Sequence, residues 1–171
     1  SSPMMSVKST QRSSSLTSPT EIPATGLLIG TPADISPSVA PHTLAIELEP
    51  PLVLDGSTTV DGVIRAMRER HLGYALITDE DKLAGIFTER DVLLSVLEED
   101  DVLHQPVSTL MATEPVCASA TDTVWRVVSL MHEGGFRQIP VVDEQQQVVA
   151  CVRHKDVAEY LVSHFARHIL N

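Results

Sequence analysis

The sequence has few of the features that mark secreted, membrane-spanning or nucleic-acid-binding proteins. No apolar run approaches the length needed to cross a membrane, and 27–29 (Leu-Leu-Ile) is too short for a signal-peptide core. Lys and Arg number 12 against 23 Asp and Glu, which gives a formal net charge of −11. Such a surface repels a phosphate backbone. We therefore expect neither nucleic acid nor a membrane among the partners.

Cysteine is also scarce. The only two, Cys117 and Cys151, fall in predicted strands among apolar neighbours. Cysteine in such surroundings behaves as a small hydrophobic residue, so we expect buried, reduced thiols rather than a disulfide bond. Reduced thiols suit the cytoplasm, which is the expected location.

The first 43 residues lack apolar periodicity and are rich in Ser, Thr and Pro. A segment of this kind cannot bury enough apolar surface to offset the entropy lost on ordering. We expect residues 1–43 to form a disordered leader.

The rest of the chain contains one pattern twice. Residues 51–97 and 115–162 share the same order of apolar and polar positions, at an offset of 64 or 65 residues. Each copy holds an apolar helix face at i, i+3, i+4 and i+7, followed by two short apolar strands and a second helix. The faces are formed by Val60, Val63, Ile64 and Met67, and by Val124, Val127, Val128 and Met131.

The predicted fold is α/β, in the broad sense that includes α+β, with two pseudo-symmetric strand-helix-strand-strand-helix repeats. We place the first repeat at 44–102 and the second at 103–171. A unit of roughly 50 residues has a marginal core, so we expect the two to pack face to face. Residues 44–50 and 104–112 are expected to lead into the copies, with Leu110 and Met111 as anchors of the second lead-in.

Three stretches resemble the signature of CBS domains, the family named after cystathionine β-synthase. They are 85–91 (Gly-Ile-Phe-Thr-Glu-Arg-Asp), 131–133 (Met-His-Glu) and 135–143 (Gly-Phe-Arg-Gln-Ile-Pro-Val-Val-Asp). Two copies in tandem resemble a Bateman module, and 160–165 is similar to the ending of stand-alone bacterial members. The resemblance covers about 44–168.

This resemblance implies a βαββα unit and a regulatory role without catalysis. It implies an adenosine-containing ligand, such as AMP, ADP, ATP, S-adenosylmethionine or NAD, and no obligatory cofactor. It also implies a homodimer formed through helices and a regulated protein partner that the sequence does not identify.

Thr88 and Asp91 lie where a strand leads into a helix N-terminus, which favours an anion. The Thr hydroxyl can bond a phosphate or ribose oxygen, whereas the Asp carboxylate suits the two hydroxyl donors of a ribose. Family members use these two residues in this way. The alternative is a helix cap, because Thr followed three residues later by an acidic residue is close to a capping box.

The second copy keeps Asp156 but has Arg153 where the family usually has Thr or Ser, and Ala150 where it usually has Gly. Arg153 could grip a phosphate with two hydrogen bonds. The alternative is that it forms a salt bridge in the cleft and closes the site. We therefore expect one competent site around Asp91 and an altered or empty one around Asp156.

Five further residues are candidates for nucleotide contact. In some relatives a basic residue near Arg137 points at phosphates; the alternative is a surface salt bridge. Adenine is expected in an apolar slot near the backbone of Tyr74 and Ala75, or of Gln138 and Ile139. Tyr74 could stack on the base or serve as a core residue.

Two other functions remain as alternatives. The first is a CBS dimerisation or interaction scaffold without a small ligand, which the departures Ala150 and Arg153 favour. The second is a metalloenzyme, since His164 and His168 have an i, i+4 spacing that can bind a metal. No third ligand is evident in the sequence, so we expect no metal site and no catalytic residues.

Overall fold

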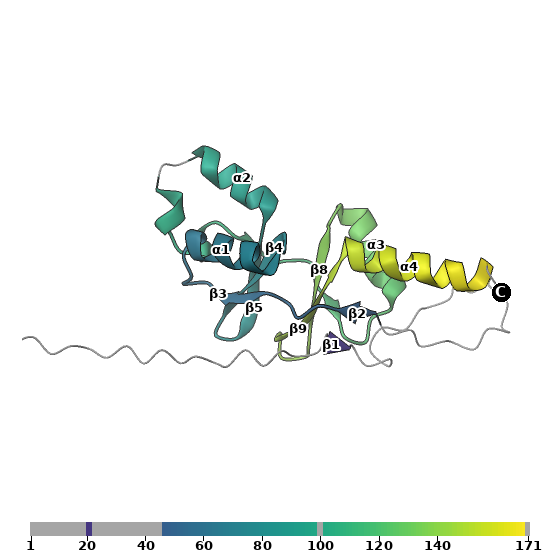
Figure 1. Ribbon diagram of the computed structural model, residues 1–171. Coiled ribbons are helices and arrows are strands. Elements are labelled where there is room, and N and C mark those ends of the chain that lie inside the picture. The colour runs from purple at the N-terminus through teal and green to yellow at the C-terminus, as the bar shows by residue number, and fades with distance from the viewer. Residues whose placement is uncertain (1–19, 22–45, 99–100, 170–171) are drawn as a thin grey trace, which may run out of the picture.

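The computed structural model describes residues 20–21, 46–98 and 101–169 (Figure 1). The expected leader lies outside these residues, apart from Thr20–Glu21. These two residues form strand β1, which pairs antiparallel with β2 (Glu47–Leu48).

The first repeat follows the predicted order. It runs through β3 (Val53–Asp55), α1 (Val60–Arg70), β4 (Tyr74–Asp79), β5 (Lys82–Thr88) and α2 (Glu89–Glu98). Strand β3 is parallel to β4, and β4 is antiparallel to β5.

The second repeat has the same order. It runs through β7 (Ala118–Ser119), α3 (Val124–Gly134), β8 (Gln138–Val142), β9 (Val148–Arg153) and α4 (His154–Ile169). Strand β7 is parallel to β8, and β8 is antiparallel to β9, so the strand directions match those of the first repeat. The α/β fold with two βαββα repeats is thus confirmed.

Local chemistry sets the ends of the two equivalent helices α1 and α3. The hydroxyl of Thr59 accepts a hydrogen bond from Gly62 N at 3.2 Å, and that of Thr123 accepts one from Arg126 N at 3.0 Å. Each bond satisfies a backbone donor in the first turn. Both helices end in a left-handed residue, at His71 (φ 52°) and Gly135 (φ 65°). Gly135 is therefore a helix cap.

The segment before each repeat packs in the core of the other repeat. Ile46 and Leu48 precede β3, the first strand of the first repeat, yet they pack in the core of the second repeat. Conversely, η1 (Val102–His104), η2 (Val107–Thr109) and β6 (Ala112–Thr113) lie against the first repeat, where β6 extends the sheet beside β5. Leu110 and Met111, the expected anchors of the lead-in 104–112, attach this segment to the core of the first repeat.

The repeats contact each other through their sheets. Cys151 on β9 belongs to the core cluster of the first repeat, and Val148 packs against that cluster. The backbone N–H of Leu83 donates to the carbonyl of Gln146 at 3.0 Å, which joins β5 to the turn between β8 and β9. Figure 1 shows α1 and α2 beside the first sheet and α3 and α4 beside the second. The expected face-to-face packing is confirmed.

No helix in the described part of the chain is both long and apolar enough to cross a membrane.

Candidate functional site

The first candidate site lies where β5 ends and α2 begins. Register places Tyr74, the first residue of β4, opposite Thr88, the last residue of β5. The backbone N–H of Thr88 donates to Oδ2 of Asp91 at 2.9 Å, and the Thr88 hydroxyl donates to the same oxygen at 3.2 Å. A carboxylate that reaches back to the N-cap N–H is half of a capping box. The capping role that was weighed for these two residues is therefore present.

The cap uses one oxygen of Asp91. Among the side chains that the structure describes, none hydrogen-bonds the other oxygen, Oδ1. An ionised carboxylate accepts hydrogen bonds and donates none, so this oxygen can receive a hydroxyl or amine proton from a ligand. Capping and ligand contact are therefore compatible at Asp91.

The second candidate site lies at the equivalent place in the second repeat, where β9 ends and α4 begins. We call these two places the first and the second edge. At the second edge, the register places Gln138 opposite Arg153. The backbone N–H of Arg153 donates to Oδ2 of Asp156 at 2.9 Å, which repeats the cap made by Asp91. This bond pairs the backbone N–H of Arg153 itself, and it does not depend on the side chain at position 153.

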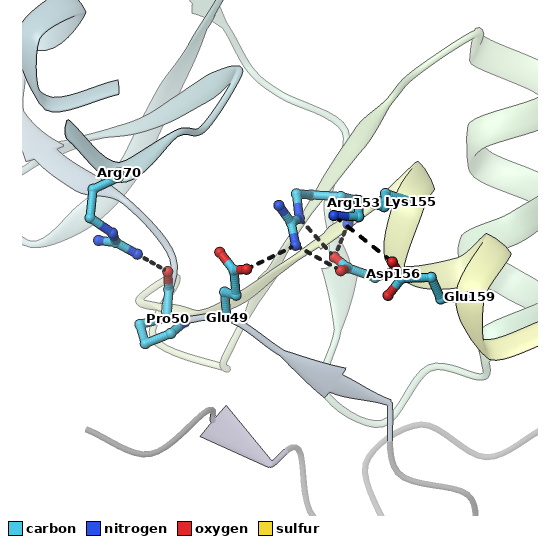
Figure 2. Close-up of polar contacts among 7 residues, drawn as sticks. All are labelled: Glu49, Pro50, Arg70, Arg153, Lys155, Asp156 and Glu159. Atoms are coloured by element: carbon cyan, nitrogen blue, oxygen red, sulfur yellow. Dashed lines mark hydrogen bonds and ion pairs between the residues drawn. The ribbon is translucent and has the colours of Figure 1, made fainter. Parts of the chain in front are cut away.

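The Arg153 side chain engages both oxygens of Asp156. Nε donates to Oδ2 at 3.1 Å and Nη2 donates to Oδ1 at 2.9 Å (Figure 2). Nη2 also lies 3.7 Å from Oε1 of Glu49. The Asp156 side chain is 5% exposed and that of Arg153 18%. Hydrogen bonding to Asp156 raises the pKa of Arg153, which keeps the guanidinium charged.

Glu49 was not among the candidate residues. It precedes the first repeat, whereas its partner Arg153 ends β9 of the second. No sequence pattern links the two, because the crossing of the flanking segment brings them together. Figure 2 shows Glu49 and Asp156 on either side of the guanidinium of Arg153.

The four residues expected to lie near the adenine are buried or half-buried. Tyr74 is 2% exposed, and Ala75 and Ile139 are fully buried, whereas Gln138 is half-buried. Burial raises the pKa of Tyr74, and interaction with Cys151 raises it further, whereas the positive charge of Arg153 lowers it. Tyr74 is thus a core residue at the junction of the repeats. In this structure its ring is not open to stacking on a base.

Both cysteines are free thiols. Burial raises the pKa of Cys151 to about 12 and also raises the pKa of Cys117. Cys151 is buried as expected, and Cys117 is half-buried just before β7. A thiol with a raised pKa is a poor nucleophile at neutral pH, so neither cysteine has the character of a catalytic residue.

Arg137 precedes β8, next to the second candidate site. It lines a groove of about 520 Å³ between α3 and α4, together with His132 and His154. Its carbonyl accepts a hydrogen bond from His154 N at 2.7 Å. A similar groove of about 620 Å³ lies between α1 and α2. Both grooves lie between the helices of one repeat, and none of the four residues Thr88, Asp91, Arg153 and Asp156 lines either one.

The difference between Gly85 and Ala150 has a packing explanation. A Cβ added at Gly85 would lie 2.4 Å from the sulfur of Met111 and 2.8 Å from the carbonyl oxygen of Ala112. Glycine is needed at position 85 because Met111 and Ala112 lie against β5 and leave no room for a Cβ atom. Ala150 occupies the equivalent strand and is fully buried in the second core. Packing therefore explains alanine at position 150, and this residue is evidence neither for nor against a ligand site.

The described residues contain no group of three or more His, Cys, Asp or Glu side chains that could hold a metal ion. The side chains of His164 and His168 are outside the described set.

Comparison with known proteins agrees with the repeat. The family model for the CBS domain matches residues 45–98 and again 107–163. A CBS domain-containing protein of Arabidopsis thaliana, CBSCBSPB1, is 34% identical over 102 residues, which cover 59% of this chain and 19% of that protein. This chain therefore corresponds to about a fifth of that relative.

Two solved structures show the same fold. The CBS domain protein PAE2072 from Pyrobaculum aerophilum, complexed with AMP, has a TM-score of 0.59 at 23% identity, over 63% of this chain and 83% of that one. The CBS domain pair of protein MJ0100, in complex with 5-methylthioadenosine and S-adenosyl-L-methionine, has a TM-score of 0.62 at 20% identity, over 68% and 91%. With both halves of the repeat matched by the family model, the chain belongs to the CBS-domain family as a tandem pair.

Proposed function

We propose that this chain is a regulatory module that binds an adenosine-containing ligand at the edge formed by Thr88 and Asp91 and performs no catalysis. The observation that carries the proposal is the oxygen Oδ1 of Asp91, which has no partner among the described residues although the rest of the cap is complete. A ribose hydroxyl is a donor of the kind that this oxygen accepts. Two proteins of the same fold carry AMP, or 5-methylthioadenosine and S-adenosylmethionine.

The regulatory step follows from the position of this edge. Tyr74 lies opposite Thr88 and packs against Cys151 of the other repeat. A ligand bound at Thr88 and Asp91 would therefore affect how the two repeats pack against each other. Regulation requires that the ligand bind two arrangements of the module with unequal affinity. The partner that reads this arrangement is a protein, and we place the pair in the cytoplasm, where the free thiols stay reduced.

Thermal unfolding of the full chain tests the ligand proposal. AMP, ADP, ATP, S-adenosylmethionine and NAD are added one at a time. A ligand that binds only the folded state, at 100 times its Kd, contributes about 2.7 kcal/mol and raises the midpoint by roughly 5–10 °C. We expect such a rise with at least one of the five. No rise with any of them would instead favour the ligand-free interaction scaffold.

We further propose that the module is a homodimer formed through its helices. Large apolar side chains are exposed on three of the four helices: Leu93, Leu94 and Leu97 on α2, Trp125 on α3, and Val162 and Phe165 on α4. Leu97 follows Leu93 by four residues and Leu94 by three, so these three side chains share one face of α2. An exposed apolar face of this kind marks an interaction surface. Leu97 is 83% exposed in the isolated chain, so a second copy would cover it.

Leu97→Glu is expected to weaken the dimer at least about tenfold, because it places a charge in an apolar contact. Light scattering after size exclusion over a range of concentrations measures the effect. Gln145→Glu is the control, since it adds the same charge in the exposed turn between β8 and β9. An unchanged dimer in Leu97→Glu would place the interface elsewhere.

A further inference from the structure

The two edges of the module are related by the repeat, yet they present different surfaces to a ligand. Residues 88 and 153 end equivalent strands, and Asp91 and Asp156 cap equivalent helices through the same backbone bond. At the first edge one carboxylate oxygen has no partner among the described residues. At the second edge the guanidinium of Arg153 bonds both oxygens. The difference comes from the side chain at one position, Thr88 or Arg153.

The guanidinium offers Asp156 the same chemistry that a ribose would. Two neighbouring hydroxyls of a ribose present two donors, which a carboxylate can accept on its two oxygens. Nε and Nη2 of Arg153 also present two donors, at 3.1 Å and 2.9 Å, in a planar fork that matches a carboxylate. A ribose and Arg153 therefore cannot use Asp156 at the same time.

Two features hold Arg153 in this position. Asp156 is 5% exposed, so its charge depends on the guanidinium for compensation in place of water. Glu49 lies on the other side of the guanidinium at 3.7 Å, which favours the same position (Figure 2). With acidic groups on both sides, the positive charge of Arg153 is already balanced without a phosphate.

We propose that Arg153 is an internal occupant of the second site, which closes that site to nucleosides and leaves one ligand per chain, bound at Asp91. The proposal rests on the proposed function, because it assumes that an aspartate at this edge receives a ribose once it is uncovered. It makes Arg153 a specificity-determining residue: it selects against ligand binding at one of two equivalent places. The two repeats together can then respond to one bound ligand, because the second edge does not compete with the first for it.

The test counts binding sites by isothermal titration with adenosine and with AMP. The full-length wild type is expected to bind one molecule per chain. Arg153→Thr gives the second edge the residue found at the first, and is expected to bind two. Arg153→Thr combined with Asp156→Asn is expected to return to one. Adenosine is included because it has no phosphate, so a gained adenosine site reports on the ribose contact.

Lys155→Thr is the matched control. It removes the same charge two residues away, where Lys155 is exposed and lies 3.8 Å from Glu159. We expect it to keep one site, which separates the position of the charge from the net charge. If Arg153→Thr does not fold, Arg153→Lys retains a cation beside Asp156 but covers fewer acceptor positions. A weaker second site is then expected.

Several results would overturn the proposal. A second site already present in the wild type is one, and no gained site in folded Arg153→Thr or Arg153→Lys is another. Loss of an AMP site in Arg153→Thr would show that Arg153 grips phosphate instead. The proposed function fails separately: if the wild type binds neither ligand and Arg153→Thr gains one site, the first-edge assignment is wrong and the closed second site stands.

Discussion

Asp91→Asn is expected to weaken nucleotide binding by about 1.5–3 kcal/mol, roughly 10- to 150-fold in Kd. The amide oxygen of asparagine can still accept the Thr88 N–H, so the cap of α2 is kept. The second oxygen, which we assign to the ribose, is replaced by an NH₂ group that donates and cannot accept. Titration of the ligand found by thermal unfolding measures the loss.

The chain offers a matched control for this substitution. Asp122 lies in the turn before α3 and is half-buried: its Oδ2 accepts a hydrogen bond from Ser119 N at 2.8 Å. Asp122→Asn makes the same chemical change in a similar local bond and is expected to leave binding unchanged. If folded Asp91→Asn bound the ligand with wild-type affinity, the assignment of Asp91 to the ribose would be wrong, whichever nucleotide is the ligand.

Leu48→Ala is expected to cost about 2–5 kcal/mol of unfolding free energy, the range for truncating a fully buried leucine. Leu48 is 0% exposed in the core of the second repeat, although it precedes the first repeat in sequence. Urea unfolding followed by fluorescence measures the loss. Trp125, the single tryptophan, lies on α3 and reports on the repeat that Leu48 supports.

Leu103→Ala is the control for the leucine truncation. Leu103 is 43% exposed on η1 and is expected to cost less than about 1 kcal/mol. If Leu48→Ala were equally mild, the segment before residue 50 would not be part of the second core. If its effect reached only the first repeat, the crossing of the flanking segments would be wrong.

The sequence predicts what depends on near neighbours in the chain. The apolar spacing of Val60, Val63 and Met67 identifies α1, because a helix brings residues three and four apart onto one face. The same holds for the capping alternative at Thr88 and Asp91. A salt bridge of Arg153 was an alternative, and the structure identifies Asp156, three residues away, as its partner. These contacts follow from local geometry.

Contacts between distant segments were not predictable in this way. Leu48 and Met111 are apolar residues beside a repeat, and nothing in their spacing tells which core receives them. Glu49 meets Arg153 only because its segment crosses to the second repeat. The burial of Tyr74 likewise depends on Cys151 of the other repeat. Each of these depends on tertiary packing, which can override any local preference.

The crossing of the flanking segments also sets the order in which the chain can complete its cores during synthesis. Leu48 leaves the ribosome before its partners, such as Val141 and Val157, which are made only after the whole first repeat. The first core in turn stays open until Val102 and Val107 are made. Contacts so distant in sequence form slowly, because the intervening loop must close first. The apolar side chains of the early segment therefore stay unburied until the second repeat has been made.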